Sequence, residues 1–136
     1  MMTQQIQHVP SSPKQAVRQD ARFDRLIDPE LLGTLAEPTR ARLMSCLLKC
    51  RRPCSVTEVA ECCDIDFSMV ARHLTTMAKA GLLSREKRGR TVWYAADGPA
   101  LAAHFRQLAE AIDELSPEEG CRGESGCGCR TASEGP

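Results

Sequence analysis

The chain has 136 residues, of which 42% are hydrophobic and 4% aromatic, enough for one small domain with an aliphatic core. No stretch is long and apolar enough to span a membrane and no signal segment opens the chain, so we expect a cytoplasmic protein without membrane contact. The net charge is zero, yet residues 40–90 hold 11 Lys and Arg against 5 Asp and Glu, whereas residues 110–136 hold 2 against 7. Because charge is segregated in this way, a neutral total does not exclude nucleic-acid binding.

Composition divides the chain into three parts. Residues 1–20 are rich in Gln, Ser and Pro without an apolar period, which indicates a disordered arm; a short helix from Lys14 that helps a dimer is the alternative. Residues 21–115 carry the periodic apolar pattern of a folded domain. Residues 116–136 are predicted to be a flexible acidic tail, since Gly and charge forbid a packed core there.

Two helices are predicted at the start of the domain. Asp28 can cap a helix whose first residue is Pro29. Pro38 opens a second helix that runs to about Lys49. The side chains of this helix that are expected to face the core are Leu43, Met44 and Leu47.

Residues 55–81 predict a helix-turn-helix. Ser55 and Glu58 have the spacing of a capping box and open a short helix that ends near Cys63. Residues 64–66 are long enough only for a turn, and another helix follows them. In a helix-turn-helix the second helix enters the major groove of DNA.

The second helix of this pair has two different faces. Asp66 or Ser68 can cap its start, and Gly81 supplies a left-handed stop. One face is an apolar stripe of Val70, Leu74 and Met77. The opposite face carries Ser68, Met69, Arg72, His73, Thr75, Thr76 and Lys79. Such a face can be merely solvated, but beside a capped first helix it favours contacts with base edges and phosphates.

A β-hairpin with a basic tip is predicted directly after this helix. Leu83, Arg85 and Lys87 fall at alternate positions before a turn at Gly89, as do Val92 and Tyr94 after it. The cations of the tip are Arg85, Lys87, Arg88 and Arg90. We expect the hairpin to be the wing of a mostly α-helical winged helix-turn-helix, with Arg88 and Arg90 on the phosphate backbone.

The last helix is predicted from Asp97 to about Leu115. Its apolar residues follow one stripe of Leu101, Phe105, Leu108, Ile112 and Leu115. The stripe is either part of the core or a dimer interface, and both readings fit the pattern. A symmetric dimer would present two reading helices to a two-fold operator.

This combination of segments resembles the ArsR/SmtB family of bacterial metal-sensing repressors. The similar segments are Leu-Ala-Glu-Pro-Thr-Arg (35–40) with the leucines that follow it, Val-Ala-Arg-His-Leu (70–74), Ala-Gly-Leu (80–82) and Arg-Gly-Arg (88–90) with Tyr94. The resemblance covers roughly residues 25–115. It implies a repressor that dimerises through its first and last helices and binds double-stranded operator DNA.

Eight cysteines in a cytoplasmic protein indicate metal binding or redox sensing rather than a disulfide framework. Cys54 follows two arginines and precedes a helix start, and both favour the thiolate, so we expect it to be the most reactive thiol. Cys62 and Cys63 diverge by about 100° on a helix, so one of them is expected to face the core. The resemblance implies that position 63 is the apolar one, which leaves Cys62 as the better ligand. With Cys46 partly in the core, no three cysteines of the domain are expected to converge.

The tail contributes Cys121, Cys127 and Cys129. Clustered thiolates suit soft ions, namely trivalent arsenic or antimony, mercury, cadmium or lead. The predicted ligands are Cys54, Cys62, Cys63, Cys121, Cys127 and Cys129. The cysteine pair of the family's arsenic sensors would fall on Ser55 and Thr57 here, so the site is family-like in kind but not in position.

The sequence therefore predicts a homodimeric repressor that releases its operator when a thiophilic metal or metalloid binds. A thiol redox or persulfide sensor of the same family, linking Cys54 to a tail cysteine, is the alternative. A soft-metal carrier or thiol oxidoreductase without DNA is less favoured, since the chain has no Cys-x-x-Cys. No Ser/His/Asp or paired-carboxylate arrangement is visible, so we expect no enzyme.

Overall fold

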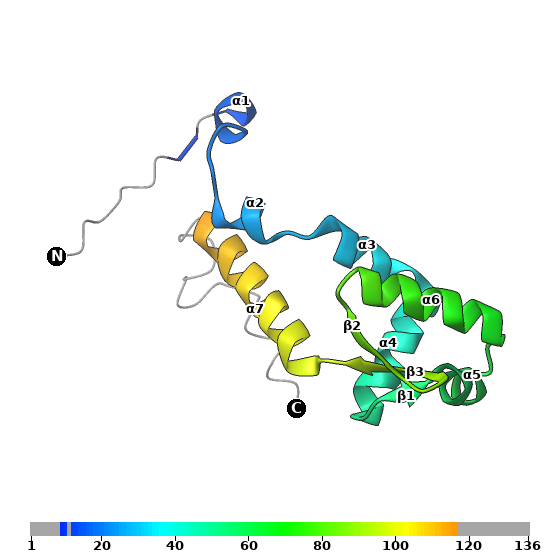
Figure 1. Cartoon of the computed structure of the whole chain (residues 1–136). Helices are drawn as coiled ribbons and strands as arrows, with labels where there is room; N and C mark the ends of the chain where they lie inside the picture. Colours follow the sequence, from blue (N-terminus) through cyan, green and yellow to red (C-terminus); the bar gives the residue numbers. More distant parts are fainter. Residues whose placement is uncertain (1–8, 11, 117–136) are drawn as a thin grey trace, which may run out of the picture. The chain divides into compact units, whose positions relative to one another are not determined.

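The computed structural model describes residues 9–10 and 12–116 (Figure 1). The elements in chain order are α1 (Pro13–Ala16), α2 (Arg22–Leu26), α3 (Pro29–Ala36), α4 (Pro38–Cys50), β1 (Cys54–Ser55), α5 (Val56–Cys63), α6 (Phe67–Lys79), β2 (Leu83–Arg88), β3 (Thr91–Ala96) and α7 (Gly98–Leu115). The described residues form two compact units, one of residues 27–107 and one that joins the described residues before 27 to residues 108–116. The predicted fold class, mostly α-helical with a β-hairpin, is confirmed.

Side-chain caps fix where the helices of the larger unit begin. Asp28 accepts a hydrogen bond from the amide of Leu31 at 3.1 Å, and Pro29 is the first residue of α3, as predicted. Glu37 accepts from the amide of Arg40 at 2.8 Å and caps α4 in the same way. These bonds satisfy amides that have no partner within the helix, so local sequence sets each boundary.

The core of the larger unit is built from α4, α5 and α6. Its fully buried side chains are Leu43, Leu47, Val59, Val70, Leu74 and Met77, each at most 2% exposed. The apolar stripe predicted for α6 therefore lies inside the core, and α6 also packs on α5 and β2. As a result, the opposite face of α6 is turned to the outside of the unit.

The sheet has three antiparallel strands in the order β1-β3-β2. Strands β2 and β3 form the predicted hairpin, in which Arg88 pairs with Thr91 across a two-residue turn where Gly89 has φ +63°. Strand β1 was not predicted from the sequence, because two residues are too few to show alternation. It places Cys54 opposite Tyr94, and this pairing joins the start of α5 to the base of the hairpin.

The smaller unit consists of α1, α2 and the end of α7. Leu108 and Ala111 are buried in it, at 8% and 0% exposure. Arg22 of α2 donates to Glu110 at 3.3 Å and to Glu114 at 2.7 Å. Helix α1 corresponds to the short helix that the sequence allowed from Lys14, one residue earlier, and residues 1–8 and 11 of the predicted arm lie outside the described residues.

None of the helices in residues 9–10 and 12–116 has the length and apolar character needed to cross a membrane.

Candidate nucleic-acid interface and cysteine pocket

Helices α5 and α6 form a helix-turn-helix with a fixed turn. Asp64 ends α5 in the left-handed conformation at φ 51°, and the amide of Ile65 donates to the carbonyl of Ala60 at 3.2 Å. The Ile65 side chain is partly buried and packs against the core, which anchors the turn. The predicted turn at residues 64–66 is thus confirmed, and it sets the direction in which α6 leaves α5.

The start of α6 is capped and exposed. Asp66 accepts from the amides of Ser68 at 3.0 Å and Met69 at 3.3 Å, which selects Asp66 from the two predicted caps. Phe67 is 53% exposed and Met69 is 44% exposed. Phe67 was missed as a candidate contact, although an aromatic residue at the first position of a polar-faced helix was a visible signal.

Six of the seven predicted contact residues of α6 form an exposed surface, here named the α6 polar face: Ser68, Met69, Arg72, Thr75, Thr76 and Lys79. The hydroxyls of Thr75 and Thr76 donate to the carbonyls of Ala71 at 2.8 Å and Arg72 at 3.0 Å. Their oxygens keep acceptor capacity toward a ligand, because each hydroxyl carries two lone pairs.

His73, the seventh predicted contact residue, is only half exposed. Its Nδ1 lies 3.5 Å from the guanidinium of Arg40, whose Nε donates to the carbonyl of Thr34 at 2.7 Å. His73 therefore lies beside the start of α4 instead of on the open face. Arg40 was missed by sequence reasoning because the contact joins residues far apart in the chain.

The basic tip of the hairpin is fully exposed. Arg88 forms an ion pair with Glu86 at 3.0 Å, which lowers the pKa of Glu86 and raises the pKa of Arg88. Arg85, Lys87 and Arg90 have no ion-pair partner in the part of the chain that the structure describes. The hairpin, whose strand β2 packs on α6, thus keeps several cations without an ion-pair partner among the described residues. Glu86 offsets the positive charge of Arg88.

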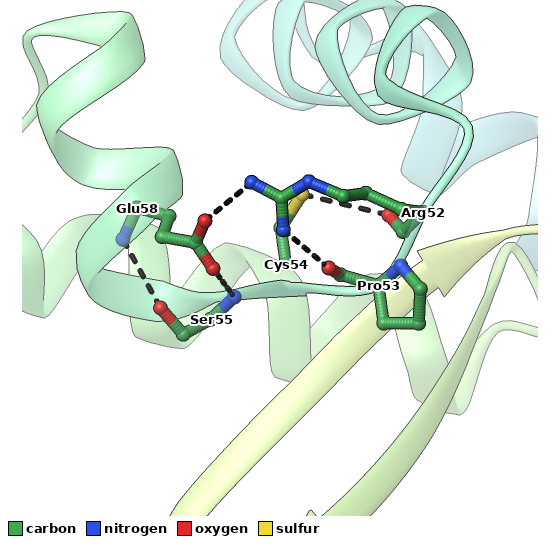
Figure 2. A network of polar contacts seen from close by, with 5 residues as sticks. All are labelled: Arg52, Pro53, Cys54, Ser55 and Glu58. Atoms are coloured by element: carbon green, nitrogen blue, oxygen red, sulfur yellow. Dashed lines mark hydrogen bonds and ion pairs between the residues drawn. The ribbon is translucent and has the colours of Figure 1, made fainter.

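The predicted capping box at the start of α5 is confirmed and extended by an arginine (Figure 2). Glu58 Oε1 accepts from the amide of Ser55 at 3.1 Å, and the amide of Glu58 donates to Ser55 Oγ at 3.2 Å. The other carboxylate oxygen of Glu58 accepts from Arg52 at 2.5 Å. Arg52 is the main reason that the pKa of Glu58 falls to about 2, followed by the Ser55 amide.

Cys54 is buried in the core, at 3% exposure, and its thiol donates to the carbonyl of Arg52 at 3.5 Å. Burial raises the pKa of this thiol to about 11, although the charge of Arg52 acts in the opposite direction. The expectation that Cys54 is the most reactive thiol is therefore wrong. Sequence reasoning missed β1, which turns Cys54 inward opposite Tyr94, and it missed Glu58, which engages Arg52.

Four cysteines line one pocket of about 440 Å³ at the ends of α4 and α5: Cys46, Cys50, Cys62 and Cys63, together with Arg42, Ser45 and Lys49. Cys62 is exposed and Cys63 is half-buried against the core, as predicted, yet both line this pocket. Burial, and then contact with Cys63, raises the pKa of Cys46 to about 12. We name this site the cysteine pocket; sequence reasoning did not bring these residues together.

Within residues 9–10 and 12–116, no three His, Cys, Asp or Glu side chains are gathered closely enough to hold a metal ion. Of the six predicted ligands, Cys62 and Cys63 line the cysteine pocket and Cys54 lies in the core. Cys121, Cys127 and Cys129 lie outside the described residues.

Known proteins share these features. A family model described as a helix-turn-helix domain matches residues 35–86. The transcriptional repressor PagR of Bacillus anthracis is 31% identical over 81 residues, which cover 60% of this chain and 80% of the relative. An ArsR-like transcriptional regulator from a Rhodococcus species is 25% identical with a TM-score of 0.56, covering 68% of this chain and 83% of that one.

The fold is also that of a homodimeric winged helix-turn-helix DNA-binding domain from Mycobacterium bovis. That structure is 20% identical, has a TM-score of 0.53 and covers 73% of this chain and 92% of its own. The predicted resemblance is thus confirmed by sequence and by structure. The capped helix-turn-helix, its basic hairpin and these relatives lead to one conclusion, that the chain belongs to the ArsR/SmtB family of transcriptional regulators.

Proposed function

We propose that this regulator is a homodimeric repressor that binds double-stranded operator DNA and releases it when a thiophilic metal or metalloid binds cysteine thiolates. The observation that carries the proposal is the α6 polar face, which one capped helix presents outward while its other side is buried in the core. The relative from Bacillus anthracis is a transcriptional repressor, which supports the same role here.

Base reading is assigned to the α6 polar face. Arg72 can donate two hydrogen bonds to a guanine, and the exposed threonines suit several base edges. Met69 and Phe67 add apolar surface near the helix start, where contacts with thymine methyl groups are made. In this motif the N-terminal part of the second helix contacts the bases. Phe67 and Met69 lie in that part of α6.

Phosphate binding is assigned to the hairpin, which then acts as the wing. Arg85, Lys87 and Arg90 are exposed and have no ion-pair partner among the described residues, so they are available to a polyanion. Phosphate contacts supply affinity that depends on salt but carry no sequence information. Arg88 must share its charge with Glu86 and is expected to contribute less than Arg90.

Dimerisation is assigned to α7, which exposes large apolar side chains on its outer side. Phe105 is 39%, Ile112 is 47% and Leu115 is 52% exposed. Removing apolar side chains of this size from water lowers the free energy of the complex and so favours association. The structural relative from Mycobacterium bovis is homodimeric, which supports a second copy of this chain as the partner.

The inducer is assigned to cysteine sulfur. Eight cysteines against three histidines leave thiolates as the plentiful donors, and they prefer soft ions such as trivalent arsenic, antimony, mercury, cadmium or lead. The exposed Cys62 stands next to the turn before α6, so an ion bound there would act close to the reading helix. Tail cysteines 121, 127 and 129 remain predicted ligands.

DNA binding is tested with an operator selected from random duplexes by the full-length protein. Arg72→Ala should lower the preference for operator over random DNA. Arg90→Ala should weaken both equally and reduce the slope of log affinity against log salt by about 0.9 per lost phosphate contact. Arg106→Ala, an exposed arginine of α7, is the matched control. If Arg90→Ala leaves the salt slope intact, the hairpin is not on the phosphates.

Induction is tested by operator release under anaerobic reducing conditions with arsenite, mercury, cadmium and lead in turn, and with a persulfide as the redox arm. Cys62→Ser and a full-length variant with serine at positions 121, 127 and 129 should still bind operator and should respond weakly to arsenite, cadmium and lead. Operator release by the persulfide and by none of the metals would contradict metal sensing and support a thiol sensor. Release at unchanged metal concentration in both variants would exclude these cysteines.

A further inference from the structure

The cysteine pocket contains one pair of thiols that links two helices. Cys46 lies in the last third of α4 and Cys63 is the last residue of α5, and both line the pocket. Both thiols are half-buried, whereas Cys50 and Cys62 of the same pocket are exposed, and the proximity of Cys63 contributes to the raised pKa of Cys46. Cys50, one helical turn beyond Cys46, also approaches it but is exposed.

The two helix ends are held together independently of the thiols. The guanidinium of Arg42, one turn before Cys46 on α4, donates to the carbonyl of Cys63 at 2.9 Å. This bond holds the end of α5 against α4. The pair of sulfur atoms is therefore positioned by packing and by a hydrogen bond that a ligand need not break.

The pocket is suited to a soft cation and not to a hard one. No carboxylate lines it, and its charged members are the cations Arg42 and Lys49. Hard ions such as Mg²⁺ and Ca²⁺ need oxygen ligands, whereas thiolates select soft ions. Two half-buried thiols can satisfy a soft ion that prefers two ligands.

We propose that Cys46 and Cys63 form a two-thiolate site for a soft, two-coordinate cation of the mercuric type, which cross-links α4 to α5. Two S–H bonds break, two S–Hg bonds form and two protons leave to solvent, with no change of oxidation state. The product is a neutral bis-thiolate, so it adds no uncompensated charge to a half-buried site.

The position of Cys63 gives this site a regulatory consequence, which rests on the proposed function. Cys63 is followed directly by the turn that directs α6. A cross-link that fixes the end of α5 changes the free energy of any conformation in which α5 and α6 move relative to α4. It releases operator only to the extent that the ion binds the released conformation more tightly.

The site is tested in full-length protein with Cys50, Cys62, Cys121, Cys127 and Cys129 all changed to Ser, which leaves Cys46, Cys54 and Cys63. Titration with mercuric chloride is followed by sulfur-to-mercury charge-transfer absorption and by metal analysis after desalting against glutathione. One mercury per chain should be retained. Cys46→Ala and Cys63→Ala in this background should each lose it, and Cys54→Ala, the matched control, should retain it.

Retention of one mercury by both Cys46→Ala and Cys63→Ala would overturn the site. Circular dichroism verifies that each variant is folded. If either is not, alkylation of the parent background followed by mass spectrometry decides instead. One equivalent of mercury should slow alkylation of Cys46 and Cys63 together, and unchanged rates at both positions would overturn the site.

Operator affinity of the same background, with and without mercury, separates this site from the proposed function. Release that depends on Cys46 and Cys63 is the expected result. Mercury retention without operator release would leave the site in place and overturn its part in regulation. Failure to bind any selected DNA would overturn the proposed repressor function, while the mercury and alkylation measurements still decide the site.

Discussion

The two compact units of the chain differ in how completely they bury their apolar side chains. The larger unit encloses Leu43, Val70 and Leu74 at 0% exposure, and its helices and sheet cover one another. The smaller unit buries Leu108 and Ala111 but leaves Ile112 and Leu115 about half exposed. The larger unit is therefore closed within one chain, whereas the smaller unit leaves an apolar surface that the proposed second copy would cover.

Electrostatics cannot close the smaller unit. Ion pairs join Arg22 of α2 to Glu110 and Glu114 of α7, and these side chains are between 37% and 65% exposed. Exposed ion pairs contribute little to stability, since water and salt screen them. Burial of the exposed apolar side chains by a partner is the stronger source of free energy.

The largest effect is expected from charges placed on the unfinished surface. Ile112→Glu combined with Leu115→Glu should convert the dimer to a monomer, because burying unpaired carboxylates is costly. Operator affinity should fall with it, since one chain can occupy only one half-site. Sedimentation velocity at micromolar concentration measures this, with Asp113→Ala as the control on the same exposed helix segment. If the wild-type protein is already a monomer at this concentration, the smaller unit is not closed by a second copy.

Shortening one leucine side chain in each unit tests this difference in burial. Leu74→Ala should lower the free energy of unfolding by roughly 2–5 kcal/mol, because it leaves a cavity in a closed core. Leu115→Ala should change unfolding of the monomer far less, since that side chain is 52% exposed. Urea denaturation at low protein concentration compares them. Equal losses would mean that the smaller unit is as closed as the larger one.

Helix caps in the two units should also differ. Ser55→Ala should cost about 1 kcal/mol, because it removes one bond of the capping box at an eight-residue helix packed on the core. Ser12→Ala should have no measurable effect on global unfolding, because Ser12 caps the four-residue α1 through a long bond of 3.4 Å. Urea midpoints of the two variants test this, and a larger loss for Ser12→Ala would reverse the ranking of the two units.

The smallest effect is a dependence on acid that belongs to the larger unit. The folded pKa of Glu58 is depressed from 4.5 to about 2 by Arg52, so its contribution is present above pH 4.5 and is lost as pH falls toward 2. Glu58→Gln should flatten the fall in stability across this window. Urea titrations at several pH values measure the slope, with Glu61→Gln, a neighbour on α5, as the control. An unchanged slope would show that the Arg52 contact does not persist in solution.

Local sequence was sufficient to predict the parts of the fold that local bonds define. The caps at Asp28, Ser55 and Asp66, the buried stripe of α6 and the turn at Gly89 all follow from residues fewer than five apart. The α6 polar face could be predicted for the same reason, because it is the complement of a buried stripe with helical period.

Contacts between distant residues were not predictable in this way. Strand β1 has only two residues, so its pairing with β3 and the burial of Cys54 needed the tertiary structure. The approach of Cys46 to Cys63 depends on how α4 packs on α5, and that of His73 to Arg40 depends on how α6 meets the start of α4. The chemistry of a thiol could be anticipated from its type, but its protonation depends on this packing.

The order of the sheet has a consequence for how copies of this protein avoid each other. Strand β2 is an edge strand, and after Leu83 all of its side chains are exposed, with four of the five charged. An unpaired strand edge can pair with a strand of another molecule and begin an aggregate. Charged side chains along that edge oppose such pairing. Replacing Arg85, Lys87 and Arg88 by threonine or valine would therefore create a self-associating edge. We therefore expect the cations of the hairpin to oppose self-association of this protein in the absence of DNA.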